Sequence, residues 1–344
     1  VYFNPITPIF ENRPPGCIIC GSPGSGKTYF LQTIMVNCLQ ERCIVIALDP
    51  KNDHEGMLKV DPSIKFRDIS KKESLDPFKC IENVDTNFIV SIIDTICGGL
   101  SKEAVVAITP IVSDYTKKAK SGNASFLKLM NYLYSNQNPL AQHVGTLLKS
   151  NEKSEYGPVF FNNEKTCLEI DRESSIICLF GLPLPKTPDR ESWTKEEMFS
   201  SAITMVLVKM LRNVLTKVNK VPVVLFIDEA HIILANPHIY KIIEEFLILG
   251  RSLNVATILA SQNVFHFPED FSNFVSNRFQ FRSSRNEVNE FLRRFLVSSE
   301  EEIDSLVSFA VNAPNGGAIM IDRKNRVGEI QISGDLGLTT TPIK

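Results

Sequence analysis

Residues 21–28, with the sequence GSPGSGKT, constrain the fold of this chain more than any other segment. They satisfy the pattern G-x-x-x-x-G-K-[S/T] in full. The apolar run 16–20 precedes them, and apolar residues follow at helical spacing (Phe30, Leu31, Ile34, Met35, Cys38 and Leu39). The sequence therefore predicts a buried strand, a glycine-rich loop and an amphipathic helix in direct succession.

A loop of this kind, a P-loop, is suited to binding phosphate. Its glycines let backbone N–H groups turn towards phosphate oxygens, at a helix N-terminus whose dipole favours anions. Lys27 is expected to reach the β- and γ-phosphates, and the Thr28 hydroxyl to bind Mg²⁺. We therefore predict a site for ATP and Mg²⁺ formed by Gly21, Ser22, Pro23, Gly24, Ser25, Gly26, Lys27, Thr28 and Tyr29. A glycine-rich turn without nucleotide is the alternative, which the flanking strand and helix disfavour.

A second apolar run, 223–227, ends in the acidic pair Asp228-Glu229. A carboxylate at the end of a buried strand can hold Mg²⁺ through water. The next carboxylate is placed to polarise the attacking water as a general base. On a solvent-facing loop such an acidic pair would not indicate a catalytic site. In a chain with a P-loop it predicts that Asp228 is a metal-binding residue and Glu229 the catalytic acid–base residue.

Two further apolar runs also end in polar residues. Gln262 follows the run 255–260, where an amide would lie beside the γ-phosphate and sense it; an ordinary polar strand end is the alternative. Asp49, with Lys51 and Asp53, follows the run 43–48. All would lie at the carboxyl edge of the sheet, where open α/β folds bind ligands. A solvated turn remains open for Lys51 and Asp53.

Three arginines are candidates for contacts beyond the chain's own nucleotide. Arg251 ends the helix after the acidic pair and could reach a neighbour's nucleotide as an arginine finger, which stabilises transition-state charge. A cation that complements the helix dipole is the alternative. Arg278 and Arg282 share one face of a strand whose two phenylalanines face the core. An interface and a plain solvated face are both open for this pair.

Apolar runs alternate with helical stretches along most of the chain, which indicates an α/β fold with a mostly parallel sheet covered on both faces. Residues 81–152 carry helical periodicity instead, so we predict an all-α insertion subdomain there, within an ATPase core of residues 1–80 and 153–344. Two hairpins are expected, one pairing 159–161 with 166–170 and one pairing 317–321 with 327–332. The first 14 residues are expected to be extended.

The charge balance limits the function classes. The 344 residues include 37 Lys and Arg against 39 Asp and Glu, with 43% hydrophobic residues. A mainly disordered chain is excluded, because such chains are poor in apolar residues. A general nucleic-acid coat is disfavoured, because it would carry a basic excess. Local basic patches stay possible, as in the cluster Arg278, Arg282, Arg285, Arg293 and Arg294.

The eight cysteines are expected to be buried, unpaired thiols, as suits a reducing cytoplasm (Cys17, Cys20, Cys38, Cys43, Cys80, Cys97, Cys167 and Cys178). Cys17 and Cys20 lie three apart in a strand, face opposite sides and cannot share a metal ion. No apolar run approaches the roughly 18–20 residues that span a bilayer, so no transmembrane segment is expected. The first residue is Val1, so we expect a fragment of a longer protein.

Together these segments resemble the HerA–FtsK branch of RecA-like motor ATPases, and within it the TraC-like ATPases of conjugative transfer and type IV secretion. The resembling segments stand in the family's order: Gly21–Thr28, Leu48-Asp49-Pro50, the helical insertion, Ile227-Asp228-Glu229-Ala230-His231, Gly250-Arg251-Ser252-Leu253-Asn254 and Ala260-Ser261-Gln262. The resemblance covers about residues 10–332, as that family's C-terminal motor domain.

The resemblance implies a RecA-like P-loop NTPase that hydrolyses ATP with Mg²⁺. It implies Lys27 and Thr28 on nucleotide and metal, Asp228 and Glu229 as acids, Gln262 as sensor and Arg251 as finger. It also implies bacterial hexamers of the full-length protein, at the cytoplasmic face of the cell membrane. There they would bind other type IV secretion channel components and power pilus assembly or substrate transfer.

Other functions share part or all of these motifs. Residues 228–231 spell the DEAH of a helicase class, but its Ser-Ala-Thr and arginine signatures are missing from the sequence. Residues 53–56 match the D-x-x-G of GTPases without an Asn-Lys-x-Asp guanine reader, so ATP is preferred. A DNA translocase or coupling protein of the same branch shares every motif and stays open. An ATP-binding assembly scaffold with slow turnover is disfavoured by the presence of Glu229 and Gln262.

Overall fold

The computed structural model describes residues 3–69, 73–119, 124–162, 167–217, 220–296 and 299–332. These residues form a nine-stranded sheet in the order β3-β4-β2-β5-β6-β1-β7-β8-β9. The strands are β1 (Gly16–Cys20), β2 (Ile44–Asp49), β3 (Lys65–Asp68), β4 (Ser175–Cys178), β5 (Val223–Ile227), β6 (Val255–Ser261), β7 (Val275–Phe281), β8 (Gly317–Ile321) and β9 (Val327–Gln331). Neighbours from β3 to β7 pair in parallel, and β7–β8 and β8–β9 are antiparallel. The predicted mostly parallel sheet and the C-terminal hairpin are confirmed.

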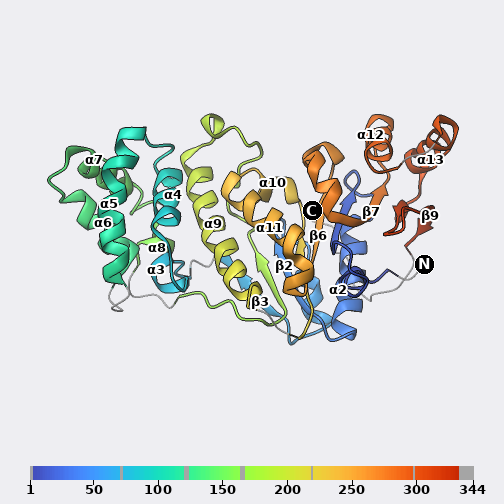
Figure 1. Cartoon of the computed structure of the whole chain (residues 1–344), viewed down its shortest axis with the longest axis horizontal. Helices are drawn as coiled ribbons and strands as arrows, with labels where there is room; N and C mark the ends of the chain where they lie inside the picture. The colour runs from blue at the N-terminus through green and yellow to red at the C-terminus, as the bar shows by residue number, and fades with distance from the viewer. Residues whose placement is uncertain are drawn as a thin grey trace.

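Helices surround this sheet. They are α1 (Thr7–Phe10), α2 (Lys27–Gln40), α3 (Pro77–Cys80), α4 (Thr86–Ile96), α5 (Lys102–Ala119), α6 (Phe126–Tyr134), α7 (Pro139–Ser150), α8 (Gly157–Phe160), α9 (Lys195–Leu215), α10 (Ala230–Leu234), α11 (Pro237–Leu253), α12 (Arg285–Phe295) and α13 (Glu300–Asn312). The helices α4 to α7 gather at one end of the molecule, beyond α9, and α12 and α13 lie at the other end (Figure 1).

The sheet separates two apolar cores, because successive strand residues point to opposite faces. Cys17 and Ile19 of β1 belong to the core that α2 covers. Ile18 and Cys20 belong to the core that contains the buried faces of α9 and α11. All five residues of β1 are buried, as expected for a central parallel strand. Cys17 and Cys20 therefore lie in different cores, as their spacing predicts.

The segment between β3 and β4 is helical where the insertion is predicted. Polar caps fix the starts of three of its helices: Asp85 accepts from the N–H of Phe88, Ser125 caps α6 and Asn138 caps α7. Such caps satisfy N–H groups that have no partner inside the helix. Helix α4 packs against α9, which joins the insertion to the sheet. The boundaries of a separate subdomain at 81–152 remain a prediction.

Two expectations about local structure are wrong. Residues 159–161 do not form a hairpin strand, because Gly157–Phe160 is the short helix α8, with Pro158 in its first turn. Phe160 and Phe161 pack beside Phe126 and Phe199 in the core, which favours this helix. The expected hairpin turn lies partly outside the described residues. The extended N-terminal segment also contains one helical turn, α1.

By length and composition alone, helix α9 could cross a membrane, although no apolar run in the sequence approaches that length. Among the described residues this is the one helix that meets both criteria. Of its apolar window, 72% is buried inside the protein. The sequence shows the shorter apolar run 202–208, but the helix keeps apolar residues on several sides because it packs between α4 and α11. This helix therefore belongs to the core described above.

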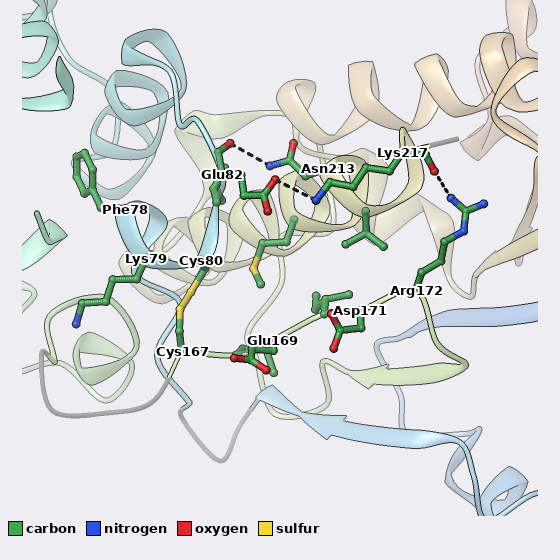
Figure 2. A pocket seen from close by; sticks show the side chains of 15 residues that line it. Phe78, Lys79, Cys80, Glu82, Cys167, Glu169, Asp171, Arg172, Asn213 and Lys217 are labelled. Carbon is green, nitrogen blue, oxygen red and sulfur yellow. Dashed lines mark hydrogen bonds and ion pairs between the residues drawn. A yellow bond between two sulfur atoms is a disulfide. The ribbon is translucent and has the colours of Figure 1, made fainter. Parts of the chain in front are cut away.

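Two cysteines form a disulfide, so the expectation of eight unpaired thiols is wrong for Cys80 and Cys167. Their Cα atoms lie 6.0 Å apart although 87 residues separate them in sequence. A β-bridge between Ser74 and Cys167 aligns the two segments, and Leu168 N–H donates to the Ser74 carbonyl at 2.9 Å. The disulfide borders an open pocket of about 700 Å³ (Figure 2). It joins the two chain segments between which the helices α4 to α8 lie.

Candidate nucleotide-binding and catalytic site

The P-loop, residues 21–28, joins the end of β1 to the start of α2. Gly24 and Gly26 have φ angles of +71° and +104°, which glycine adopts without a steric penalty. A Cβ on Gly26 would lie 2.8 Å from the backbone nitrogen of Gly316, which donates to the carbonyl of Ser25 at 2.9 Å. The Ser25 hydroxyl is buried and has no hydrogen-bond partner in the described structure. The loop is therefore a close-packed cradle with an unused polar group.

Lys27 lies buried inside this cradle. Its Nζ donates to the carbonyl of Gly21 and to that of Ser22, the latter at 3.1 Å. Burial lowers the pKa of Lys27, while the nearby carboxylates of Glu229 and Asp228 partly oppose this effect. The loop thus combines a glycine-rich turn at the start of α2 with a partly desolvated amine, a combination suited to a phosphate ligand.

Asp228 lies beside the end of β2, because β2 and β5 are neighbours in the sheet. Its N–H donates to the carbonyl of Leu48 at 3.2 Å, and one carboxylate oxygen lies 3.4 Å from Nε2 of His54. Burial alone would raise the pKa of Asp228, but His54 and the N–H of Glu229 outweigh it and lower this pKa. The pKa of His54 is raised, since acidic neighbours outweigh its burial. Asp228 is therefore held as an ionised carboxylate.

Glu229 has an unusual backbone conformation, with φ +44° and ψ +48°. For a residue with a Cβ this left-handed conformation costs about 1–2 kcal/mol, and such strain is common at functional sites. Its Oε1 accepts from Nε2 of Gln262 at 3.1 Å and pairs with Nζ of Lys51. Its Oε2 is buried and has no hydrogen-bond partner in the described structure. One oxygen is held by two donors, and the other is available to accept a proton.

Two histidines border this carboxylate. Nδ1 of His231 lies 3.4 Å from Oε2 of Glu229 and 3.1 Å from Oγ of Ser261, which also contacts His266 at 2.7 Å. The two imidazole rings stack with centroids 4.3 Å apart. Burial lowers the pKa of His231 and of His266, so both are neutral near pH 7. The cation in direct contact with Glu229 is therefore Lys51, while the charge of Lys27 acts on it from the P-loop.

Thr28 and Tyr29 begin α2 and are half-buried. The strands that precede Thr28 and Asp228, β1 and β5, flank β6 on its two sides, so both residues lie at the carboxyl edge of the sheet. A hydroxyl and an ionised carboxylate are the hard oxygen donors that Mg²⁺ prefers. Together with the cradle and its unpartnered Ser25 hydroxyl, these residues fit a magnesium–nucleotide complex.

Arg251 is not brought to this edge. It is exposed near the C-terminus of α11, a helix of 17 residues that starts near the acidic pair and ends before β6. At 1.5 Å per residue the helix spans about 25 Å, so Arg251 lies at the amino edge, far from Glu229. The structure therefore separates Arg251 from the other predicted site residues. This is the placement expected of an arginine that reaches a neighbour's nucleotide.

Arg278 and Arg282 have structural partners. Arg278 donates to the Val275 carbonyl at 2.7 Å and lies over the ring of Phe295, with its guanidinium carbon 5.4 Å from the centroid. Arg282 donates to the side chain of Asn315 at 3.1 Å. Its own carbonyl accepts from the N–H of Ser22 in the P-loop at 2.9 Å. Arg282 therefore supports the P-loop through its backbone, while Phe279 and Phe281 face the core as predicted.

Sequence reasoning missed one residue of this site and left a second one open. His54 was not predicted as a partner of Asp228, and Lys51 was left between a ligand-edge position and a solvated turn. The available signal was the segment Asp49-Pro50-Lys51-Asn52-Asp53-His54, which follows a buried strand. It indicates polar residues at the carboxyl edge but not which carboxylate each cation contacts. That choice depends on β2 lying next to β5.

A family model described as an AAA-like domain matches residues 10–334. The chain belongs to this family. A search of curated protein sequences gave no match. Among solved structures, VirB4 of Thermoanaerobacter pseudethanolicus is similar with a TM-score of 0.76 at 14% identity, covering 93% of this chain and 89% of that one.

The bacterial conjugative coupling protein TrwB is similar with a TM-score of 0.61 at 12% identity, over 94% of this chain and 86% of that one. A structure of TrwB in complex with ADP and Mg²⁺ gives a TM-score of 0.59 at 13% identity, with the same shares covered. These similarities establish a shared fold, and together with the AAA-like domain they confirm the predicted P-loop NTPase fold.

Proposed function

We propose that this chain is the ATP-hydrolysing motor domain of a bacterial type IV secretion or conjugation system, where it powers pilus assembly or substrate transfer. One observation carries the proposal. A P-loop with a buried lysine lies at the same sheet edge as Asp228 and Glu229, within a fold that resembles VirB4 over 93% of the chain. A nucleotide-binding scaffold would not need the strained, oriented carboxylate of Glu229.

The proposed reaction is hydrolysis of ATP to ADP and phosphate. The backbone of residues 21–29 and the Lys27 amine would bind the phosphates. Thr28 and Asp228 would hold Mg²⁺, which when bound supplies charge neutralisation at the phosphates. Glu229 would accept the proton of the attacking water at Oε2, the oxygen that accepts no hydrogen bond in the described structure. Gln262, which donates to Oε1, is the proposed γ-phosphate sensor.

We further propose that Arg251 acts on the nucleotide of a neighbouring subunit in a homo-oligomer, a hexamer for the full-length protein. Its position near the far end of α11, at the amino edge of the sheet, separates it from its own site. Two apolar residues of the same helix, Ile248 and Leu249, are 51% and 42% exposed next to it. Exposed apolar surface beside a cation suits a protein–protein contact.

The cellular location is part of the same proposal. We propose that the protein works at the cytoplasmic face of the cell membrane and is held there by other components of the secretion channel. The support is the similarity of fold to VirB4 and to the conjugative coupling protein TrwB. Contact with DNA is a second candidate property, because the fold also matches TrwB over 94% of the chain.

The test measures ATP turnover by the assembled oligomer at a fixed salt concentration, with and without double-stranded DNA. We expect Mg²⁺-dependent turnover that EDTA abolishes, and DNA should leave the rate unchanged. Glu229→Gln should bind ATP and hydrolyse it at least ~10²-fold more slowly, the scale of general-base loss. Strong stimulation by DNA would favour a DNA translocase. Tight ATP binding without turnover by the wild-type oligomer would favour an assembly scaffold.

A further inference from the structure

The turn after β2 is built around one buried carboxylate. Asp49 is fully buried and accepts from three backbone N–H groups, those of Lys51 and Asp53 at 3.2 Å and of His54 at 2.9 Å. Asn52, in the left-handed region at φ +61°, completes the turn. A carboxylate that accepts several N–H bonds fixes the backbone around it. The positions of Lys51 and His54 are therefore set by Asp49.

This turn lies against the proposed catalytic residues, because β2 pairs with β5. His54 reaches Asp228, and Lys51 reaches Glu229. The Lys51 side chain is 44% exposed, whereas that of Glu229 is 5% exposed. The lysine thus extends from solvent to cover one oxygen of a buried carboxylate. Each acid of the pair receives its own partner from the same turn, an imidazole for Asp228 and an ammonium group for Glu229.

Other groups around Glu229 cannot replace this lysine. Gln262 donates to the same oxygen but carries no charge. The pKa of His231 is lowered by burial, so its ring is neutral near pH 7. The charge of Lys27 acts on Glu229, but its Nζ donates to the carbonyls of Gly21 and Ser22 instead. Without the direct contact from Lys51, the buried carboxylate would lose much of its orientation.

We propose that Lys51 is a positioning residue for ATP hydrolysis. Together with Gln262 it holds Oε1 of Glu229, so that Oε2 remains the oxygen that accepts the proton of water. This inference rests on the proposed function and adds a residue that acts through Glu229. It predicts an effect on the rate of the chemical step and little effect on nucleotide binding.

The experiment compares kcat, KM and ATP affinity of Lys51→Met with those of the wild-type oligomer. Lys51→Met should lower kcat at least ~10-fold, within the range by which positioned acid–base groups contribute, with ATP affinity within about twofold. Lys51→Arg should recover most of the rate, because it restores a cation. Lys59→Met is the matched control, since Lys59 is an exposed lysine of the same segment, and it should behave as wild type.

A double variant separates positioning from an independent role. In a Glu229→Gln background Lys51→Met should cause no further loss, because both changes act through one carboxylate. An unchanged or raised kcat in Lys51→Met, an additive loss in the double variant, or weaker ATP binding with unchanged kcat would each overturn the inference. If the wild-type oligomer itself does not hydrolyse ATP, the proposed function fails instead, so the two failures are distinguishable.

Discussion

The two edges of the central sheet differ in how they use charge. At the carboxyl edge, Lys27, Asp49, Asp228 and Glu229 are all less than 10% exposed and contact one another or nearby backbone. At the amino edge the structure includes exposed charges. The ion pair Lys217–Glu82 beside the disulfide pocket, for example, joins side chains that are 63% and 72% exposed (Figure 2).

This difference shows where chemistry is to be expected. Buried charges are unfavourable unless each is paired or hydrogen-bonded, so a sheet edge that collects four of them serves a purpose other than stability. Exposed ion pairs contribute about 0–1 kcal/mol. The pocket at the amino edge carries the disulfide and exposed pairs but none of the predicted catalytic residues. We therefore expect substitutions at the two edges to separate activity from stability.

The largest effect on activity is expected for Lys27→Ala at the carboxyl edge. The variant should lose tight ATP binding and with it turnover, because the lysine is the cation of the phosphate cradle. Isothermal titration with ATP and Mg²⁺ measures this, with Lys59→Ala as the control for loss of a lysine. Retained ATP affinity would contradict the assignment of the P-loop.

The amino edge should affect activity only through a neighbouring subunit. Arg251→Ala should slow turnover strongly, since an arginine finger is worth roughly 10³–10⁵ in rate, without weakening ATP binding in the same chain. Mixing Arg251→Ala with Glu229→Gln protein should restore some turnover, because mixed rings contain sites with both groups intact. Failure to restore it in rings shown by native mass spectrometry to be mixed would indicate a structural role within one chain.

The smallest effect on activity is expected at the disulfide. Cys167→Ser should lower the free energy of unfolding by about 2–4 kcal/mol, because Cys80 and Cys167 close a loop of 87 residues. The ATP affinity should stay within about twofold. Thermal unfolding with and without reductant measures this, and reductant should destabilise the wild type but not the variant. A larger change in ATP affinity would show that the two edges are coupled.

Much of the fold could be predicted from short segments. Strands β1 and β5 are uninterrupted apolar runs, and β2 and β6 are mostly apolar, which is typical of parallel strands buried on both faces. Strand β3 could not be predicted in this way, since Lys65-Phe66-Arg67-Asp68 lies at the edge of the sheet and is half exposed. The helix α8 also escaped prediction, because the short apolar run Val159–Phe161 fits a strand and a helix turn equally well.

The chemical groups of the site can be read from the sequence alone. They are a P-loop, an acidic pair after one apolar strand, and polar residues after two others. Local motifs carry this information because glycine conformation, strand burial and helix starts depend on neighbouring residues. The order of the strands decided which groups meet. Placing β2 beside β5 and β5 beside β6 brings Lys51 and Gln262 to one oxygen of Glu229. The same tertiary packing brings Cys80 to Cys167, because strand order and helix packing depend on contacts between distant residues.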